Sequence, residues 1–142
     1  MIGKEFVLGL VAGVMLAAPY VTYASHRPRS SRIFGVGLVG AAMIYVVLAV
    51  AYGTLRNSLV ETAGLGMFLG VAALGVRFSR YVLALGWVAH VAWDLVLHPV
   101  NASSYAPWWY PVMCIGFDLL VAGAIVGTSS RDQRTRRLEN RS

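Results

Sequence analysis

The segment Tyr81–His98 carries three titratable side chains, His90, Asp94 and His98, spaced four residues apart in an otherwise apolar run. On an α-helix this spacing places them on one face, with neighbours about 6 Å apart along the axis. Ionisable groups are costly inside a membrane, so such a stripe indicates a functional site. Imidazole with carboxylates can bind zinc, iron or manganese. Alternatively, Asp94 or an acid from another helix could orient His90 as a general base.

Two further apolar runs bring acids to a similar depth. Asp118 lies in the run 112–127, and Glu61 lies near the start of the run 59–76. At ~1.5 Å per helical residue, Asp118 and His90 are about 10 and 12 Å from the same membrane edge. No comparable group lies in the other half, which argues against a simple proton channel. The candidate catalytic residues are His90, Asp94 and Asp118, and the candidate metal ligands are His90, Asp94, His98, Asp118 and Glu61.

Each candidate also has a structural interpretation. Ser58 and Glu61 match the S-x-x-E capping box, in which the acid closes a helix start. His98 precedes a proline at the predicted membrane interface and could be solvated there. Asp118 could hydrogen-bond a helix hydroxyl or His90, and Cys114 is typical of a small buried apolar residue. A fully structural cluster would make the protein a non-catalytic scaffold.

The elements that would position these residues are five apolar runs, each near the ~17–25 residues of a spanning helix. The chain of 142 residues is 58% hydrophobic and only 13% charged, against about 25% charged in soluble domains. We predict an all-α polytopic membrane helical bundle, with one five-helix domain over residues 1–128 and a basic polar tail over 129–142. The runs are Phe6–Ala24, Ile33–Tyr52, Leu59–Val76, Tyr81–Leu97 and Val112–Gly127.

Ten of the 12 basic residues fall on one predicted side of the membrane, after the first, third and fifth runs. The positive-inside rule then places the N-terminus outside and the C-terminal tail in the cytoplasm. This alternation requires the third run as a span. We expect a multi-pass protein of the cell membrane, the inner membrane in a bacterium. The basic residues lie between apolar runs and not on one soluble face, so nucleic acid is not an expected partner.

Glycine patterns in the apolar runs favour helix packing over cofactor binding. Gly35, Gly37 and Gly40 match G-x-G-x-x-G, but the strand that must precede a dinucleotide fingerprint is missing. The pairs Gly9/Gly13 and Gly66/Gly70 are small-xxx-small seams that bring helices together. The seams can lie within one chain or between chains, so a homo-oligomer is possible beside the surrounding membrane lipids.

The motifs H-x-x-W-D-x-x-x-H (His90 to His98) and A-P-x-W-Y-P-x-x-C-x-G-F-D (Ala106 to Asp118) resemble those of a family of small bacterial integral membrane proteins, known as a domain of unknown function. The resemblance extends over most of the chain and includes a glutamate corresponding to Glu61. It implies a compact multi-helix membrane fold and supports the site residues, without implying a reaction.

Three functions follow as hypotheses. The first is an intramembrane metal-binding or acid–base site that faces the outside, in an enzyme acting on a lipid or small amphiphile if the site is catalytic. The second is a small ion- or proton-coupled transporter that uses the same acids. The third is the scaffold with a structural polar cluster.

Overall fold

The computed structural model describes residues 3–98 and 105–139, with side chains described up to residue 130. Nearly all of this part of the chain is α-helical, and it contains no strand. Five helices in it are long and apolar enough to cross a membrane, which confirms the predicted helical bundle. The helices are α1 (Lys4–Ser25), α2 (Ser30–Tyr52), α3 (Leu55–Arg77), α4 (Arg80–Leu97) and α5 (Trp109–Glu139).

The start of α3 differs from the prediction. The helix begins at Leu55, and its N-cap is Thr54, whose hydroxyl accepts a hydrogen bond from the Asn57 backbone amide at 3.3 Å. Asn57 in turn accepts from the Thr54 backbone at 3.1 Å. The capping box is therefore Thr54 with Asn57, and the interpretation of Ser58 and Glu61 as the cap is wrong. Glu61 lies in the second turn of α3, where its carboxylate is available for other contacts.

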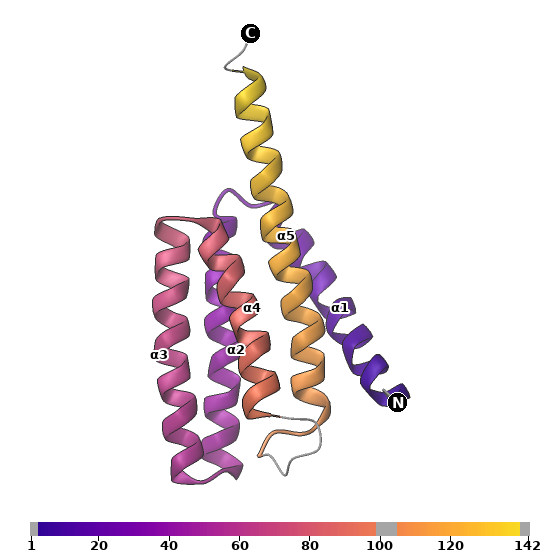
Figure 1. Ribbon diagram of the computed structural model, residues 1–142, viewed down its shortest axis with the longest axis vertical. Helices are drawn as coiled ribbons and strands as arrows, with labels where there is room; N and C mark the ends of the chain where they lie inside the picture. Colours follow the sequence, from indigo (N-terminus) through magenta and orange to yellow (C-terminus); the bar gives the residue numbers. More distant parts are fainter. Residues whose placement is uncertain (1–2, 99–104, 140–142) are drawn as a thin grey trace.

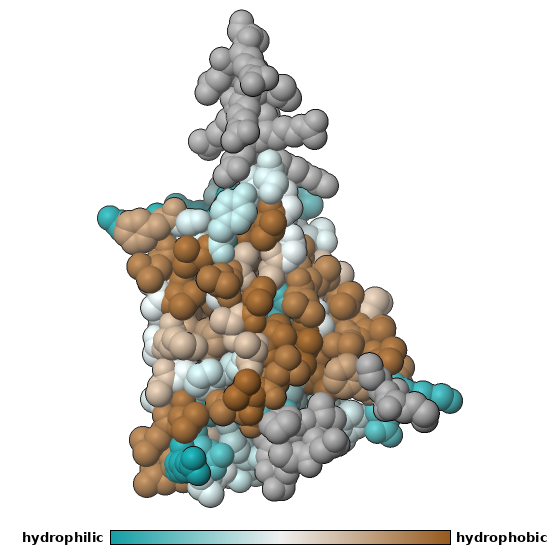
Figure 2. Space-filling view, in the orientation of Figure 1, coloured by the Kyte–Doolittle hydropathy of each residue, from teal (hydrophilic) through white to brown (hydrophobic). Residues whose placement is uncertain are grey.

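The helices run alternately up and down (Figure 1). Helices α2 to α5 lie side by side, whereas α1 packs on α5 and diverges from the rest. The α1–α2 connection, the α3–α4 turn and the polar extension of α5 all lie at the same end of the bundle. The segments that carry most of the basic residues thus meet at one end. Figure 2 shows apolar side chains over most of the middle of this face and hydrophilic ones mainly near the ends.

Glycines allow α1 to pack against α5. A Cβ atom on Gly13 would collide with the backbone of Met113 and Phe117, and one on Gly116 would collide with the backbone of Leu10. The seam at Gly9 and Gly13 is therefore used within the chain.

The second predicted seam, at Gly66 and Gly70, has a different environment. No described atom outside the immediate helix backbone lies within 4 Å of a Cβ added at either glycine. This seam is not used for packing among the described residues.

Helix α5 continues as a helix beyond the predicted span. The apolar part ends near Ser130, yet the helix extends through the predicted tail to Glu139. Arginine, glutamine, leucine and glutamate are good helix formers, so the polar sequence does not interrupt the helix.

Candidate functional site

Helices α4 and α5 bring together His90, Asp94 and Asp118, which we call the inner triad. His90 and Asp94 come from successive turns of α4, and Asp118 comes from α5. His90 Nδ1 donates to Asp118 Oδ2 at 2.8 Å and lies 3.7 Å from Asp94 Oδ2. Each residue offers a possible ligand atom within 4.8 Å of the other two. All three side chains are buried, and α2 closes the site with Tyr45.

The inner triad leaves many polar atoms without partners. Among the described residues, seven buried side-chain nitrogen and oxygen atoms make no hydrogen bond, and four of them belong to the triad. These four are His90 Nε2, both carboxylate oxygens of Asp94, and Asp118 Oδ1. Buried polar groups in native proteins are nearly always hydrogen-bonded, and an unpaired buried charge costs several kcal/mol. The triad thus has the donor atoms for a ligand and lacks a protein partner for them.

Aromatic rings enclose the inner triad. Phe68 of α3 lies edge-on to His90, with ring centroids 5.0 Å apart. Tyr45 is fully buried, its ring lies 5.9 Å from His90, and its hydroxyl lies beside Asp94 and Cys114 without making a hydrogen bond. The apolar walls lower the local dielectric and strengthen any charge interaction inside.

Glu61 and His98 belong to a second group, the outer cluster, which also includes Trp93 and Tyr105. Glu61 Oε2 accepts a hydrogen bond from Trp93 Nε1 at 3.1 Å. Glu61 Oε1 accepts from His98 Nε2 at 3.2 Å and from the Tyr105 hydroxyl. Burial and the bond to Glu61 raise the pKa of Tyr105 above its usual value of 10.0, so this hydroxyl remains a donor at neutral pH. Each Glu61 oxygen therefore has at least one partner.

The structure divides the five candidate ligands between these two groups. His90, Asp94 and Asp118 meet at one point, while Glu61 and His98 pair with each other. His98 is buried, with only 2% of its surface exposed, and it stacks on Tyr45 at 4.3 Å. It is not the solvated interfacial residue that its place before a proline suggested. The ring of Tyr45 contacts both imidazoles and so links the two groups.

No role was assigned to Tyr45 or Trp93 from the sequence. Tyr45 lies seven residues from the end of an apolar run, too deep for an interfacial belt, but this position does not reveal which residues its ring contacts. The Trp93 ring packs directly against Gly64, which has no side chain to displace it. A Cβ atom on Gly64 would approach the Trp93 ring to 2.5 Å, so only glycine lets the indole reach Glu61.

Separate cavities lead to the two groups. A largely apolar cavity of about 330 Å³ lies between α1, α2 and α5, and it reaches Asp118 past Gly40, Ala41 and Phe117. A cavity of about 240 Å³ near the α2–α3 turn reaches Glu61 past Thr54, Arg56 and Asn57. The inner triad is thus approached from the apolar flank of the bundle and the outer cluster from its polar end.

The chain matches no protein-family model, no curated protein and no solved structure in the comparisons with known proteins.

Proposed function

We propose that the protein binds a divalent metal ion at the inner triad within the membrane, with His90, Asp94 and Asp118 as ligands. The observation that carries this proposal is the set of four buried triad atoms without hydrogen-bond partners. Two ionised carboxylates beside a neutral imidazole carry a formal charge of minus two, which a divalent cation would neutralise. Without a cation, the same carboxylates must take up protons or remain unpaired in an apolar setting.

The distances among the triad atoms suit such an ion. Zinc ligands bind at about 2.0–2.2 Å, which places neighbouring ligand atoms about 3.0–3.5 Å apart in tetrahedral or similar geometry. If His90 Nδ1 is the ligand, metal binding displaces the proton that it donates to Asp118, and the pairs of 2.8 and 3.7 Å around Nδ1 then bracket this range. Small side-chain rotations are therefore sufficient to bring these ligand atoms to bonding distance from one ion. Mixed nitrogen and oxygen donors fit zinc, iron or manganese better than they fit magnesium or calcium.

Three protein ligands leave a position for water or a substrate group, as in catalytic zinc sites. Such an ion would supply Lewis acidity or an activated water. Tyr45 lies where its hydroxyl can hydrogen-bond an Asp94 oxygen or a molecule bound beside it. The apolar cavity that reaches Asp118 would admit an amphiphile more readily than an ion pair or a sugar. A lipid or small amphiphile is accordingly the class of substrate we propose.

A second candidate is acid–base chemistry without a metal. Asp118 holds His90 Nδ1 at 2.8 Å while His90 Nε2 has no partner. A carboxylate that fixes one ring nitrogen and leaves the other free is the arrangement of an oriented general base. The metal proposal is preferred because acid–base chemistry leaves both oxygens of Asp94 unexplained.

We further propose that the N-terminus faces outside and the C-terminus the cytoplasm of a bacterial cell membrane. The support is the excess of arginine at the end where α1–α2, α3–α4 and the α5 extension meet (Figure 1). A fluorescent protein fused after residue 142 should then fluoresce in the cytoplasm. A reporter enzyme that is active only outside the cytoplasm should show no activity when fused at the same position.

Elemental analysis of the purified protein tests the metal proposal. We expect near-stoichiometric zinc, iron or manganese after dialysis against metal-free buffer. Asp118→Asn should lose most of it, because an amide is a weaker ligand. Glu61→Gln removes an equally buried acid of the outer cluster and should retain the metal. A wild-type protein that is folded and still metal-free after growth with added metals would contradict the proposal.

A further inference from the structure

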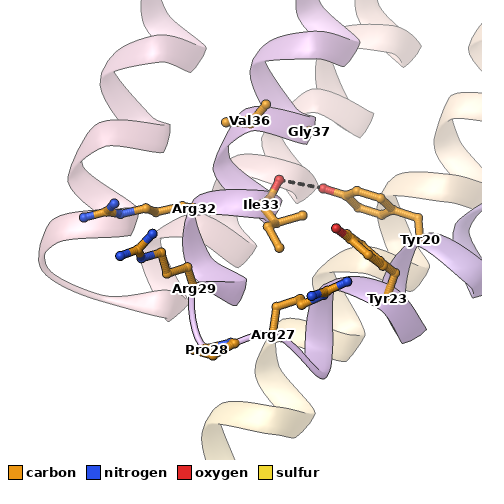
Figure 3. A pocket seen from close by; sticks show the side chains of 9 residues that line it. All are labelled: Tyr20, Tyr23, Arg27, Pro28, Arg29, Arg32, Ile33, Val36 and Gly37. Atoms are coloured by element: carbon orange, nitrogen blue, oxygen red, sulfur yellow. Dashed lines mark hydrogen bonds between the residues drawn. The ribbon is translucent and has the colours of Figure 1, made fainter.

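The opposite end of the bundle from the two polar clusters holds a cavity of about 770 Å³, at the α1–α2 turn. Figure 3 shows its lining: Tyr20 and Tyr23 come from α1, the turn contributes Arg27 and Pro28, and Arg29 and Arg32 lie on the other side of Ile33. Tyr20 donates to the Ile33 carbonyl at 2.8 Å, which ties the end of α1 to the start of α2. The cavity therefore has a fixed aromatic wall and a rim of arginines, in which Arg29 and Arg32 lie together and Arg27 lies apart beside Tyr23 (Figure 3).

Three arginines line the cavity without an acidic partner among the described side chains. Arg27, Arg29 and Arg32 are exposed, and no carboxylate among the described side chains forms an ion pair with any of them. The guanidinium of Arg27 lies over the Tyr23 ring, 4.6 Å from its centroid. Arginine pairs with phosphate through two parallel hydrogen bonds and stacks on aromatic rings. This rim is suited to a phosphate that approaches from the membrane interface.

Two apolar grooves lead from the rim into the membrane region. One of about 450 Å³ runs between α2 and α3, and it begins at Arg32 and Val36, which also line the large cavity. The other is the cavity of about 330 Å³ between α1, α2 and α5, which shares Tyr20 and Gly37 with the large cavity. The two grooves thus diverge on either side of α2, with Val36 at the fork. One polar head and two apolar chains would match this shape.

We propose that a single anionic diacyl phospholipid binds astride α2, with its phosphate at Arg29 and Arg32, whose guanidinium groups lie on the same side of α2 (Figure 3), and one chain in each groove. The charges select an anionic lipid over a zwitterionic one, because no acid among the described side chains pairs with these arginines. The diverging grooves select a diacyl lipid over free phosphate. This inference does not depend on a metal at the inner triad, but the groove between α1, α2 and α5 is the cavity that reaches Asp118, so a chain bound there would compete with an amphiphile for access to the triad.

Native mass spectrometry tests the proposal directly. The whole protein is reconstituted in nanodiscs that contain equal amounts of phosphatidylglycerol and phosphatidylcholine with the same chains, and then released. We expect one phosphatidylglycerol to be retained in preference to phosphatidylcholine. Arg32→Gln should reduce the retained fraction at least fivefold. Arg77→Gln is the matched control, because Arg77 is an exposed arginine at the same end of the bundle but outside the cavity lining.

Two more variants separate a fitted site from general attraction to charge. Arg32→Lys keeps the charge but loses the planar fork, so a fitted site predicts an intermediate loss. Val36→Trp fills the fork at a position that is 73% exposed, so it should reduce lipid retention while leaving thermal stability unchanged.

Several outcomes would overturn the proposal. Equal losses in Arg32→Gln and Arg77→Gln would mean surface charge only. Equal retention of both lipids would mean that the protein binds their acyl chains and does not recognise the headgroup charge. Displacement of phosphatidylglycerol by millimolar inorganic phosphate would mean a free-phosphate site instead of a lipid site.

Discussion

The outer cluster and the inner triad contain similar residues and are linked by the ring of Tyr45. They differ in how many hydrogen bonds their carboxylates accept. In the outer cluster, Glu61 accepts hydrogen bonds on both oxygens from three donors. In the inner triad, Asp94 makes no hydrogen bond and Asp118 makes one. Both groups contain imidazole and carboxylate, so residue type does not distinguish them.

This difference separates a structural role from a ligand site. A carboxylate that is fully hydrogen-bonded by its own chain offers little to a metal, and losing it leaves its donors unpaired. A carboxylate that is buried without partners destabilises the fold unless something binds it. We therefore assign the outer cluster to holding α3, α4 and the segment before α5 together, and the inner triad to binding.

The largest effect on stability should come from breaking the outer cluster. Glu61→Ala leaves the donors of buried His98 and of half-buried Trp93 and Tyr105 without their acceptor, at a cost of about 1–3 kcal/mol. Reversible denaturation in detergent measures this against Glu5→Ala, an exposed acid in α1. If both variants are equally stable, the outer cluster has no structural role.

Removing a charge from the inner triad should raise stability, whereas breaking the outer cluster should lower it. In the presence of a chelator, Asp94→Asn removes a buried charge that makes no side-chain hydrogen bond and keeps the shape of the side chain. We expect the variant to be more stable than wild type by about 1 kcal/mol. Added zinc should reverse the order, because only the wild type gains binding energy. Lower stability of Asp94→Asn under chelation would remove the distinction between the two groups.

A smaller loss is expected for Tyr105→Phe, which removes one of three donors to Glu61 and should cost about 0.5–1 kcal/mol. The pKa of Tyr105 is raised in the folded protein. Its contribution is therefore complete below the usual tyrosine pKa near 10 and declines at higher pH, where the unfolded chain loses this proton first. The difference between wild type and variant should be constant from pH 6 to 9 and shrink above 10. A difference that grows above pH 10 would contradict this assignment.

The smallest change in stability is expected for Tyr45→Phe. The phenyl ring keeps the stack on His98, and the hydroxyl that is lost has no hydrogen bond. We expect less than about 0.5 kcal/mol in the metal-free protein. If the hydroxyl supports Asp94 once an ion is bound, zinc affinity should fall about tenfold. Tyr52→Phe, at a 76% exposed position, is the control that should change neither quantity.

The five helices could be predicted from the sequence because apolar length and arginine placement are properties of each segment alone. The meeting of His90 with Asp94 was also predictable, since helical spacing sets it. The partner of Glu61 was not, because it depends on how α3 is rotated about its axis. The sequence also left Glu61 with a second interpretation, as part of a cap with Ser58. The helix is in fact capped by Thr54 and Asn57, four residues earlier.

Tyr45 could not be assigned from its own helix. It lies in the apolar run of α2, and only the packing of α2 on α4 places its ring between His90 and His98. The unpaired state of Asp94 was equally hidden, because spacing shows which groups approach each other and not which atoms remain without a partner.

X-ray absorption at the zinc edge of the reconstituted protein tests the central claim most directly. A site built from the inner triad predicts low-atomic-number ligands near 2.0–2.2 Å and the outer-shell scattering of one imidazole ring. The spectrum should persist in His98→Ala and disappear in His90→Ala. Scattering from two imidazoles, or a zinc signal that survives His90→Ala and is lost in His98→Ala, would place the metal at the outer cluster and contradict the assignment.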